Sequence, residues 1–290
     1  MIKSMTGFGK SICKTSKRLF SIEIKSYNGK QTDIYLKVPQ ILKNKEIELR
    51  ELIINELIRG KIECTITSEY IGEDLPININ SQLIKSYYKQ LLEISEELNC
   101  VNEPLLNIIF RFPEVLKPSD EELEEKDWNE FCNSFLNALN QVNQFRLNEG
   151  KALAEDLKEK VIKIKNLLIE ITFFEDARIN KIKERLKKNL EISLKENEYD
   201  KNRFEQELIY YLDKLDINEE KVRLDQHLNH FLDTLNNEEN CGRKLQFIAQ
   251  EMGREINTIS SKANDYDIQR ITILMKDELE KIKEQVLNVL

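Results

Sequence analysis

The sequence has no long apolar run and few residues that break helices. Nowhere do apolar residues continue for the roughly 20 positions that a membrane-spanning helix needs. The N-terminus also lacks the apolar stretch of a secretory signal peptide. Only 8 glycines and 5 prolines occur among 290 residues, which excludes a glycine- or proline-rich disordered chain. We therefore expect a helix-rich protein that is not embedded in a membrane and that resides in the cytoplasm.

Paired cysteines are also missing. The five cysteines are odd in number, widely scattered, and never form a C-x-x-C pair. This pattern argues against a disulfide framework and against a zinc knot. We expect reduced and mostly buried thiols at Cys13, Cys64, Cys100, Cys132 and Cys241.

Positive charge is in deficit as well. The net charge is -8 and the isoelectric point is near 5.2. Affinity for nucleic acids comes largely from clustered lysine and arginine. Any nucleic-acid site must therefore be a local basic surface on an acidic protein.

What is present indicates a folded protein of the α+β class. Hydrophobic residues make up 40% and charged residues 33%, and 290 residues suffice for about two domains. Strand and helix patterns alternate in the first 80 residues, whereas helical periodicity dominates from about Asp120 onward. We predict a small α+β domain at residues 1–118. A mostly helical domain should follow at 119–290, with long antiparallel helices and a C-terminal helical hairpin.

The N-terminal pattern predicts a β-β-β-α-β unit. Alternating residues indicate strands within 1–10, 17–25 and 31–38, the last two joined by a turn at 28–30. Apolar spacing near the helical period then indicates a helix that ends at Gly60, a suitable C-terminal cap. The remaining elements are that helix at 41–58, a strand at 61–70 and a further helix from Ser81.

Helical periodicity predicts an antiparallel hairpin within residues 216–262. Each residue advances by roughly 100° around a helix, so one apolar stripe runs along 217–235 and another along 245–259. A short polar connection at 236–240 joins them. A polar stripe flanks each apolar stripe on the same rotational side. The first contains Glu220, Arg223, His227 and His230, and the second contains Lys244, Glu251, Glu255, Thr258 and Lys262.

These two polar stripes should meet when the hairpin closes, because equivalent flanks face each other in an antiparallel pair. Reflection about the loop predicts the facing pairs His227 with Glu251, Arg223 with Glu255, Glu220 with Thr258, and Asp216 with Lys262. Carboxylates and a neutral imidazole bind hard or borderline divalent ions, and one or two carboxylates suffice for Mg²⁺. Such an ion polarises a phosphate and acidifies its water. The pattern thus suits phosphodiester chemistry.

The same stripes have an ordinary structural interpretation. Glutamate, arginine and lysine edge the core of any helical hairpin, and Arg223 with Glu255 would then be a simple salt bridge. His227 alone is more often a packed residue than a ligand, and we expect His230 at the surface. Spacing by itself leaves both interpretations open.

Motifs at both ends of the chain are more specific. The opening run is Ser4-Met5-Thr6-Gly7-Phe8-Gly9, followed by Ser26-x-Asn28, Asp33-Ile34 and Arg59-Gly60-Lys61. Arg146-Leu147-Asn148-Glu149-Gly150-Lys151-Ala152-Leu153 lies in the middle. The longest stretch comes last, and comprises Asp216-Ile217-Asn218-Glu219-Glu220, Arg223-Leu224, His227-Leu228, Gly242-Arg243-Lys244-Leu245, Gln250-Glu251-Met252, Arg254-Glu255-Ile256-Asn257-Thr258-Ile259 and Ser261-Lys262.

With these motifs the chain resembles the YicC/YloC family, bacterial cytoplasmic proteins described as metal-dependent endoribonucleases. It departs from the family pattern at Gly29-Lys30, where a His or Arg and then an Arg are usual, so a basic contact there rests on Lys30 alone. Gln246, Gly253 and Ser260 replace an expected Asp, Asn and Gly. The resemblance implies a homo-oligomer, a hexamer, that closes around RNA and cuts it with a divalent metal ion.

Pattern and resemblance together lead to the hypothesis of an endoribonuclease. The catalytic residues would be His227, Glu220, Glu251 and Glu255, and His227, Glu251 and Glu255 would hold Mg²⁺ or Mn²⁺. The RNA contacts would be Arg223, Arg243, Lys244, Arg254, Asn257 and Lys262.

The alternative is a non-catalytic oligomeric RNA-binding or adaptor protein that acts with a separate nuclease. Carboxylates distinguish the two, because an RNA binder gains nothing from Glu beside phosphate unless a cation lies between them. No nucleotide cofactor is expected, since the glycines in the opening run match neither phosphate-loop pattern.

Overall fold

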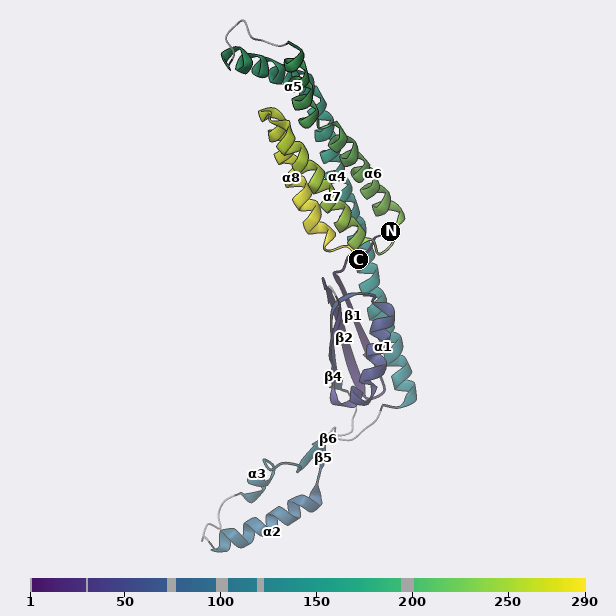
Figure 1. Cartoon of the computed structure of the whole chain (residues 1–290). Coiled ribbons are helices and arrows are strands. Elements are labelled where there is room, and N and C mark those ends of the chain that lie inside the picture. Colours follow the sequence, from purple (N-terminus) through teal and green to yellow (C-terminus); the bar gives the residue numbers. More distant parts are fainter. Residues whose placement is uncertain (1, 30, 72–76, 98–103, 119–122, 194–200) are drawn as a thin grey trace.

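The computed structural model describes residues 2–29, 31–71, 77–97, 104–118, 123–193 and 201–290. They form a sheet region, a small separate unit and a long helical bundle (Figure 1). One 69-residue helix, α4 (Glu125–Ser193), runs from the sheet region into the bundle. At 1.5 Å per residue it is about 100 Å long. The predicted α+β class is confirmed.

The sheet contains β1 (Gly7–Lys14), β2 (Arg18–Tyr27), β3 (Thr32–Lys37) and β4 (Gly60–Tyr70), in the order β1-β2-β4-β3. β1, β2 and β4 are antiparallel neighbours, whereas β3 pairs in parallel with β4. A parallel pair needs a crossover, which η1 (Gln40–Lys45) and α1 (Glu46–Glu56) supply. The predicted β-β-β-α-β order is therefore confirmed.

Details of that unit differ from the prediction. β2 and β3 do not pair around the turn at 28–30, because β4 buries Ile62, Cys64 and Ile66 and takes the place beside β2. Residues 41–45 form a 3₁₀ helix before the α-helix begins. The helix ends at Glu56 with Leu57 as its C-cap, so Gly60 is not its cap. Gly60 instead starts β4 with φ of +128°, a conformation that favours glycine.

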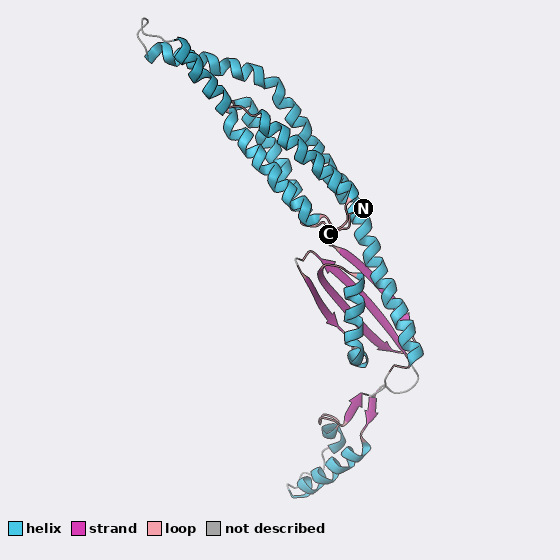
Figure 2. Ribbon diagram, turned by 45° about the vertical axis from the view of Figure 1, so that its right-hand side comes forward, coloured by secondary structure: helices cyan, strands magenta, loops and turns pink. Residues whose placement is uncertain are grey.

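One face of the sheet packs on α1 and on the first part of α4 (Figure 2). Their shared core contains Phe20, Ile22 and Ile24 from β2 and Phe131 and Phe135 from α4. Helix and strand approach closely at Gly9, where a Cβ atom would lie 2.2 Å from the carbonyl oxygen of Ala138. Glycine at this position therefore allows β1 to lie directly on α4.

Replacing Gly9 with alanine is expected to lower the free energy of unfolding by about 1–3 kcal/mol, because the added methyl group meets backbone that cannot yield without moving the helix. Urea denaturation measures this difference. Lys10→Ala, at the exposed neighbouring position, serves as the control and should change stability by less than about 0.5 kcal/mol. Equal stability of Gly9→Ala and the parent would contradict the packing described.

The helical bundle consists of the second part of α4 with α5 (Lys201–Lys214), α6 (Asn218–Asn237), α7 (Gly242–Ala263) and α8 (Tyr266–Val286). An apolar stripe runs along α8 and needs a partner within or between chains to be buried. That partner lies in the same chain, because α8 packs on α4 and α7. The stripe is buried throughout, at Ile268, Ile271, Met275, Leu279, Ile282 and Val286.

A small unit is formed by β5 (Ile77–Ile79), α2 (Ser81–Glu97), α3 (Leu105–Ile109) and β6 (Leu116–Pro118). The two short strands pair antiparallel, and α2 confirms the helix predicted from Ser81. Two larger cores lie elsewhere, one under the sheet and one in the bundle, and α4 contributes to both. The domain boundary at 118 stays a prediction.

The thiols agree with the expectation from the sequence. Cys13, Cys64 and Cys241 are buried and free, and Cys132 is free and partly buried, while Cys100 lies outside the described residues. Burial raises the pKa of the Cys64 thiol to about 12. Within the described ranges, none of the helices is long and apolar enough to cross a membrane.

Candidate functional site

The predicted hairpin forms from α6 and α7. The two helices pack along their length and join through a short turn at 238–241. Leu224, Leu228 and Phe231 of α6 are fully buried, as are Leu245 and Met252 of α7. The apolar stripes therefore meet as predicted, and the polar stripes follow the edge of their contact.

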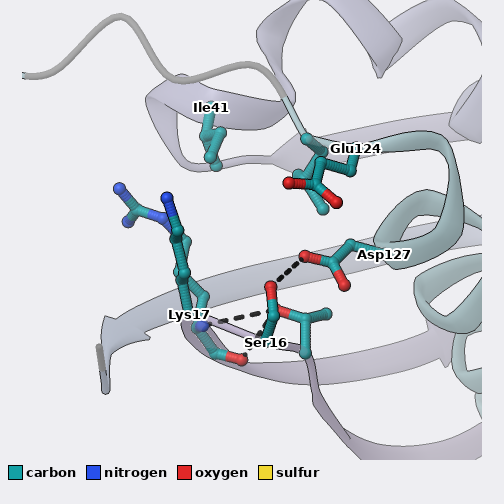
Figure 3. Close-up of a pocket in the computed structure, with 8 residues that line it drawn as sticks. Ser16, Lys17, Ile41, Glu124 and Asp127 are labelled. Atoms are coloured by element: carbon teal, nitrogen blue, oxygen red, sulfur yellow. Dashed lines mark hydrogen bonds between the residues drawn. The ribbon is translucent and has the colours of Figure 1, made fainter. Parts of the chain in front are cut away.

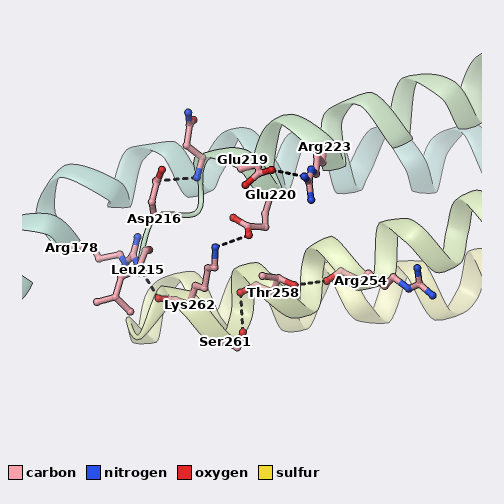
Figure 4. Close-up of polar contacts among 11 residues, drawn as sticks. Arg178, Leu215, Asp216, Glu219, Glu220, Arg223, Arg254, Thr258, Ser261 and Lys262 are labelled. Carbon is pink, nitrogen blue, oxygen red and sulfur yellow. Dashed lines mark hydrogen bonds and ion pairs between the residues drawn. The ribbon is translucent and has the colours of Figure 1, made fainter. Parts of the chain in front are cut away.

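One ion pair crosses the hairpin, between Lys262 and Glu220 (Figure 4). The ammonium of Lys262 lies 2.7 Å from Oε1 of Glu220, whose side chain is only 8% exposed. Asp216 was predicted to lie level with Lys262, and no ion pair joins these two described residues. Asp216 precedes α6 and accepts a hydrogen bond from the backbone N–H of Asn218 at 3.1 Å, satisfying one of the free donors at the helix start.

The structural interpretation predicted a salt bridge between Arg223 and Glu255, and this pair does not form. Arg223 pairs instead with Glu219, four residues earlier on α6 (Figure 4). Glu255 is half-buried, and no hydrogen bond or ion pair joins it to any described residue. Among the described residues, the Glu255 carboxylate therefore has no structural partner.

Glu251 carries a second unsatisfied carboxylate oxygen. Its Oε1 is buried and has no hydrogen-bond partner among the described residues. Nη1 of Arg254 lies 2.8 Å away in ion-pair contact, but this guanidinium is 74% exposed and does not meet hydrogen-bond geometry. Oε2 of Glu220 is likewise buried without a donor. Buried carboxylate oxygens without donors are energetically costly, and a bound cation would satisfy them.

His227 is half-buried and forms no hydrogen bond with the described residues, and no contact of this kind joins it to Glu251. Across the described ranges, no group of three His, Cys, Asp or Glu side chains has the spacing of a metal site. The trio of His227, Glu251 and Glu255 is therefore not assembled as a complete ligand set in the single chain. Within that trio, Glu251 is the residue with a buried carboxylate oxygen that lacks a hydrogen-bond donor among the described residues.

The predicted RNA contacts on α7 are mostly accessible. Arg243, Lys244, Arg254 and Asn257 are exposed. Lys244 pairs with Glu238 at the start of the helix. Lys262 differs from the others, because its ammonium is committed to Glu220.

Comparison with known proteins bears on the whole chain. The N-terminal region of the YicC-like endoribonuclease family matches residues 2–155, and its C-terminal domain matches residues 171–290. The chain belongs to the YicC-like endoribonuclease family. It is 34% identical over 295 residues to a protein of Clostridioides difficile (strain 630) named probable endoribonuclease YicC. It is 28% identical over 290 residues to a protein of the same name from Haemophilus influenzae, and both alignments cover the full length of each chain.

Two buried arginines, Arg178 and Arg146, have structural roles that were not predicted from the sequence. Arg178 of α4 donates to the carbonyl oxygens of Ala263, Lys262 and Leu215, at 2.6, 2.9 and 2.6 Å, and so ties the end of α7 to the start of α6 (Figure 4). Burial lowers its pKa. Nothing in its sequence context marks it. Arg146 lies inside a segment that carried the YicC-like resemblance, which was the available signal.

Arg146 joins the segments of the resemblance in space. It is 1% exposed and donates to Ser26 Oγ, to the carbonyl oxygen of Arg59 at 3.1 Å and to that of Met5 at 3.5 Å. Its own carbonyl accepts from the N–H of Ser4. The opening motif of this YicC-like chain therefore has a structural role, fastening the sheet to α4.

A small hollow of about 90 Å³ lies where the β1–β2 turn meets the start of α4 (Figure 3). Ser16 donates to Oδ2 of Asp127 there at 2.7 Å. The lining carries both signs of charge, with Lys17 and Arg18 opposite Glu124 and Asp127. It lies outside the α6–α7 hairpin, and we assign it no catalytic role.

Replacing Lys262 with methionine is expected to lower the free energy of unfolding by about 1–2 kcal/mol, because Glu220 would keep a buried charge without its partner. Adding Glu220→Gln to Lys262→Met should recover most of that loss. A double-mutant cycle by urea denaturation measures the coupling. Additive effects of the two substitutions would show that the ion pair does not stabilise the hairpin.

Proposed function

We propose that this chain is an endoribonuclease that cuts internal phosphodiester bonds of RNA with a divalent metal ion, Mg²⁺ or Mn²⁺, at the edge of α6 and α7. Membership of a family named for that activity supports the reaction. The location of the metal site on α7 is supported by Glu251, whose buried Oε1 has no hydrogen-bond donor among the described residues. We propose the cytoplasm as the place of the reaction.

Glu251 and Glu255 would hold the metal from α7, and His227 would approach from α6. The ion, when bound, would polarise the phosphate and acidify a water molecule. His227 has no partner among the described residues, so its imidazole is available as a ligand or to move a proton. Lys262 forms an ion pair with Glu220, so Glu220 would support the site rather than hold the metal.

The exposed cations of α7 would hold the RNA backbone. Arg254 is 74% exposed, and Arg243, Lys244 and Asn257 are exposed along the same helix. Binding of a phosphate by Arg254 would draw its guanidinium from Glu251 and free that carboxylate for a cation. Arg223 would join them from α6, once released from Glu219. These residues give the acidic protein the local basic surface that RNA needs.

Assembly into a homo-oligomer, a hexamer, would complete the site. Large apolar side chains remain exposed on the bundle, among them Val222, Phe247, Ile273 and Leu274. Apolar surface of this kind is typical of contacts between subunits. Light scattering at micromolar concentration should give the mass of an oligomer, and a monomer would overturn this part of the proposal.

Cleavage of linear and circular RNA by the purified protein tests the activity. A circular RNA has no ends, so only an endonuclease can open it. We expect cutting of both RNAs with Mg²⁺ or Mn²⁺ and none with chelator. Binding without cutting under all metal conditions would instead support a non-catalytic adaptor that acts with a separate nuclease.

A further inference from the structure

A pocket of about 420 Å³ lies where the sheet region meets the helical bundle. Arg59 and the loop residues Asn28 and Gly29 line it from the sheet side, and Arg243 and Gln246 line it from the N-terminal part of α7. The amide of Asn28 donates to the carbonyl oxygen of Leu287 at 2.8 Å, and thereby holds the two sides together. The pocket is separate from the carboxylates of α6 and α7 described above.

Two guanidinium groups line this pocket, those of Arg59 and Arg243. Neither Arg59 nor Arg243 forms an ion pair with any described carboxylate, although the protein as a whole carries a net charge of -8. Nε of Arg59 is buried and has no hydrogen-bond partner, and its Nη2 reaches only the sulfur of Met5, at 3.7 Å. Burial, and secondarily repulsion by Arg243, lowers the pKa of Arg59. Like charges held together without a partner are costly unless an anion joins them.

The start of α7 adds backbone donors to the same place. Cys241, the residue before the helix, forms no capping hydrogen bond through its side chain. The N–H of Gly242 donates to Leu290 at 3.2 Å, and the N–H groups of Arg243 and Lys244 have no acceptor among the described residues. The first turn of a helix carries partial positive charge and binds phosphate groups through such free donors.

We infer that this pocket binds a phosphate group of the RNA, with Arg59 and Arg243 donating hydrogen bonds to its oxygens. The inference rests on the proposed function for the identity of the ligand. Guanidinium groups bind phosphate through paired hydrogen bonds. The volume exceeds that of a phosphate and leaves room for the attached ribose. The group is either a terminal 5′-phosphate or a phosphodiester within the strand, and both present the same oxygens.

Fluorescence anisotropy with a short oligoribonucleotide, carrying either a 5′-phosphate or a 5′-hydroxyl, tests this inference. Chelator in the buffer separates binding from cleavage. Arg59→Gln and Arg243→Gln are each expected to weaken affinity about tenfold. Each should also make the dependence of log affinity on log salt shallower by about 0.7. The control is Arg270→Gln, which removes an exposed arginine from α8 and should bind as the parent does.

The two RNAs distinguish the two sources of phosphate. If the pocket takes a terminal phosphate, the parent protein binds the 5′-phosphate RNA about tenfold more tightly, and Arg59→Gln loses this preference. If it takes an internal phosphate, both RNAs bind equally and both weaken in the variants. Affinities of Arg59→Gln and Arg243→Gln equal to that of Arg270→Gln, for both RNAs, would overturn the inference.

Thermal melting separates a binding role from a structural one. Arg243→Gln should melt at the same or a higher temperature, because it relieves repulsion with Arg59 and breaks no ion pair with the described residues. A lower melting temperature would contradict this. A parent protein that binds as expected but cuts no RNA with Mg²⁺ would overturn the proposed activity and leave the pocket standing. Cutting by the parent with unaltered affinity in both variants would overturn the pocket alone.

Discussion

Replacing Arg146 with methionine is expected to lower the free energy of unfolding by about 3 kcal/mol or more. The guanidinium is 1% exposed and supplies donors to Ser26 Oγ and to the carbonyl oxygens of Arg59 and Met5. Methionine keeps much of the apolar stem but removes the donor to Ser26 Oγ and to the carbonyl of Arg59, and each such loss costs about 1–3 kcal/mol. The carbonyl of Met5 keeps its hydrogen bond from the Ser26 hydroxyl at 2.7 Å. Urea denaturation followed by circular dichroism measures the loss.

Two controls make the Arg146 result specific. Arg270→Met removes an exposed arginine from α8 and should change stability by less than about 0.5 kcal/mol. Ser26→Ala removes one of the three acceptors together with the hydroxyl donor to the Met5 carbonyl, and should cost less than Arg146→Met. An Arg146→Met protein as stable as the parent would show that this residue does not fasten the sheet to α4.

Replacing Glu255 with glutamine is expected to reduce cleavage about 100-fold or more while leaving RNA affinity near or above the parent value. Loss of the carboxylate removes a metal ligand, and loss of its negative charge relieves repulsion of phosphate. Melting temperature should stay unchanged, because Glu255 has no salt bridge with Arg223 to lose. Glu284→Gln, on the exposed side of α8, is the matched control and should cut as the parent does.

Three interpretations of the site can be distinguished on one Glu255→Gln preparation by measuring its melting temperature, its RNA affinity and its cleavage of RNA. A catalytic role predicts loss of cleavage alone. A structural role predicts a lower melting temperature, with cleavage falling only in proportion to unfolding. The adaptor alternative predicts no cleavage by parent or variant.

Arginine and lysine on the same helix should behave in the opposite way. Arg254→Ala or Lys244→Ala is expected to weaken RNA binding and to reduce its dependence on salt, because each removes a phosphate contact. Bound RNA should still be cut. Anisotropy and cleavage assays on the same variants measure both effects, and unchanged affinity in both variants would place the RNA elsewhere.

Periodicity was enough to predict the helices and their pairing. The apolar stripes of α6 and α7 recur at helical spacing over about 20 residues each and have one way to be buried, so the hairpin followed from the sequence. The order of strands in the sheet did not follow. Alternation identifies β2 and β3 as strands, but the central place of β4 depends on the crossover through α1, which no local pattern records.

Polar contacts were harder to predict than apolar ones. Arg223 was predicted to face Glu255 across the hairpin. Its exposed side chain pairs instead with Glu219, one turn away on the same helix. Asp216 was predicted to lie opposite Lys262, but its carboxylate accepts a hydrogen bond from the backbone N–H of Asn218 at the start of α6. Arg146 and Arg178 bond mainly to backbone carbonyls of distant segments, and carbonyl groups carry no residue-specific signal in a sequence.

Opening of a circular RNA tests most directly whether this chain cuts RNA with the carboxylates of α7. The parent is compared with the Glu251→Gln, Glu255→Gln double variant. We expect the parent to open the circle with Mg²⁺ or Mn²⁺ and to leave it closed with chelator. The double variant should bind the RNA, melt near the parent temperature, and leave the circle intact with either metal. A folded double variant that still opens the circle in a metal-dependent way would show that the site lies elsewhere.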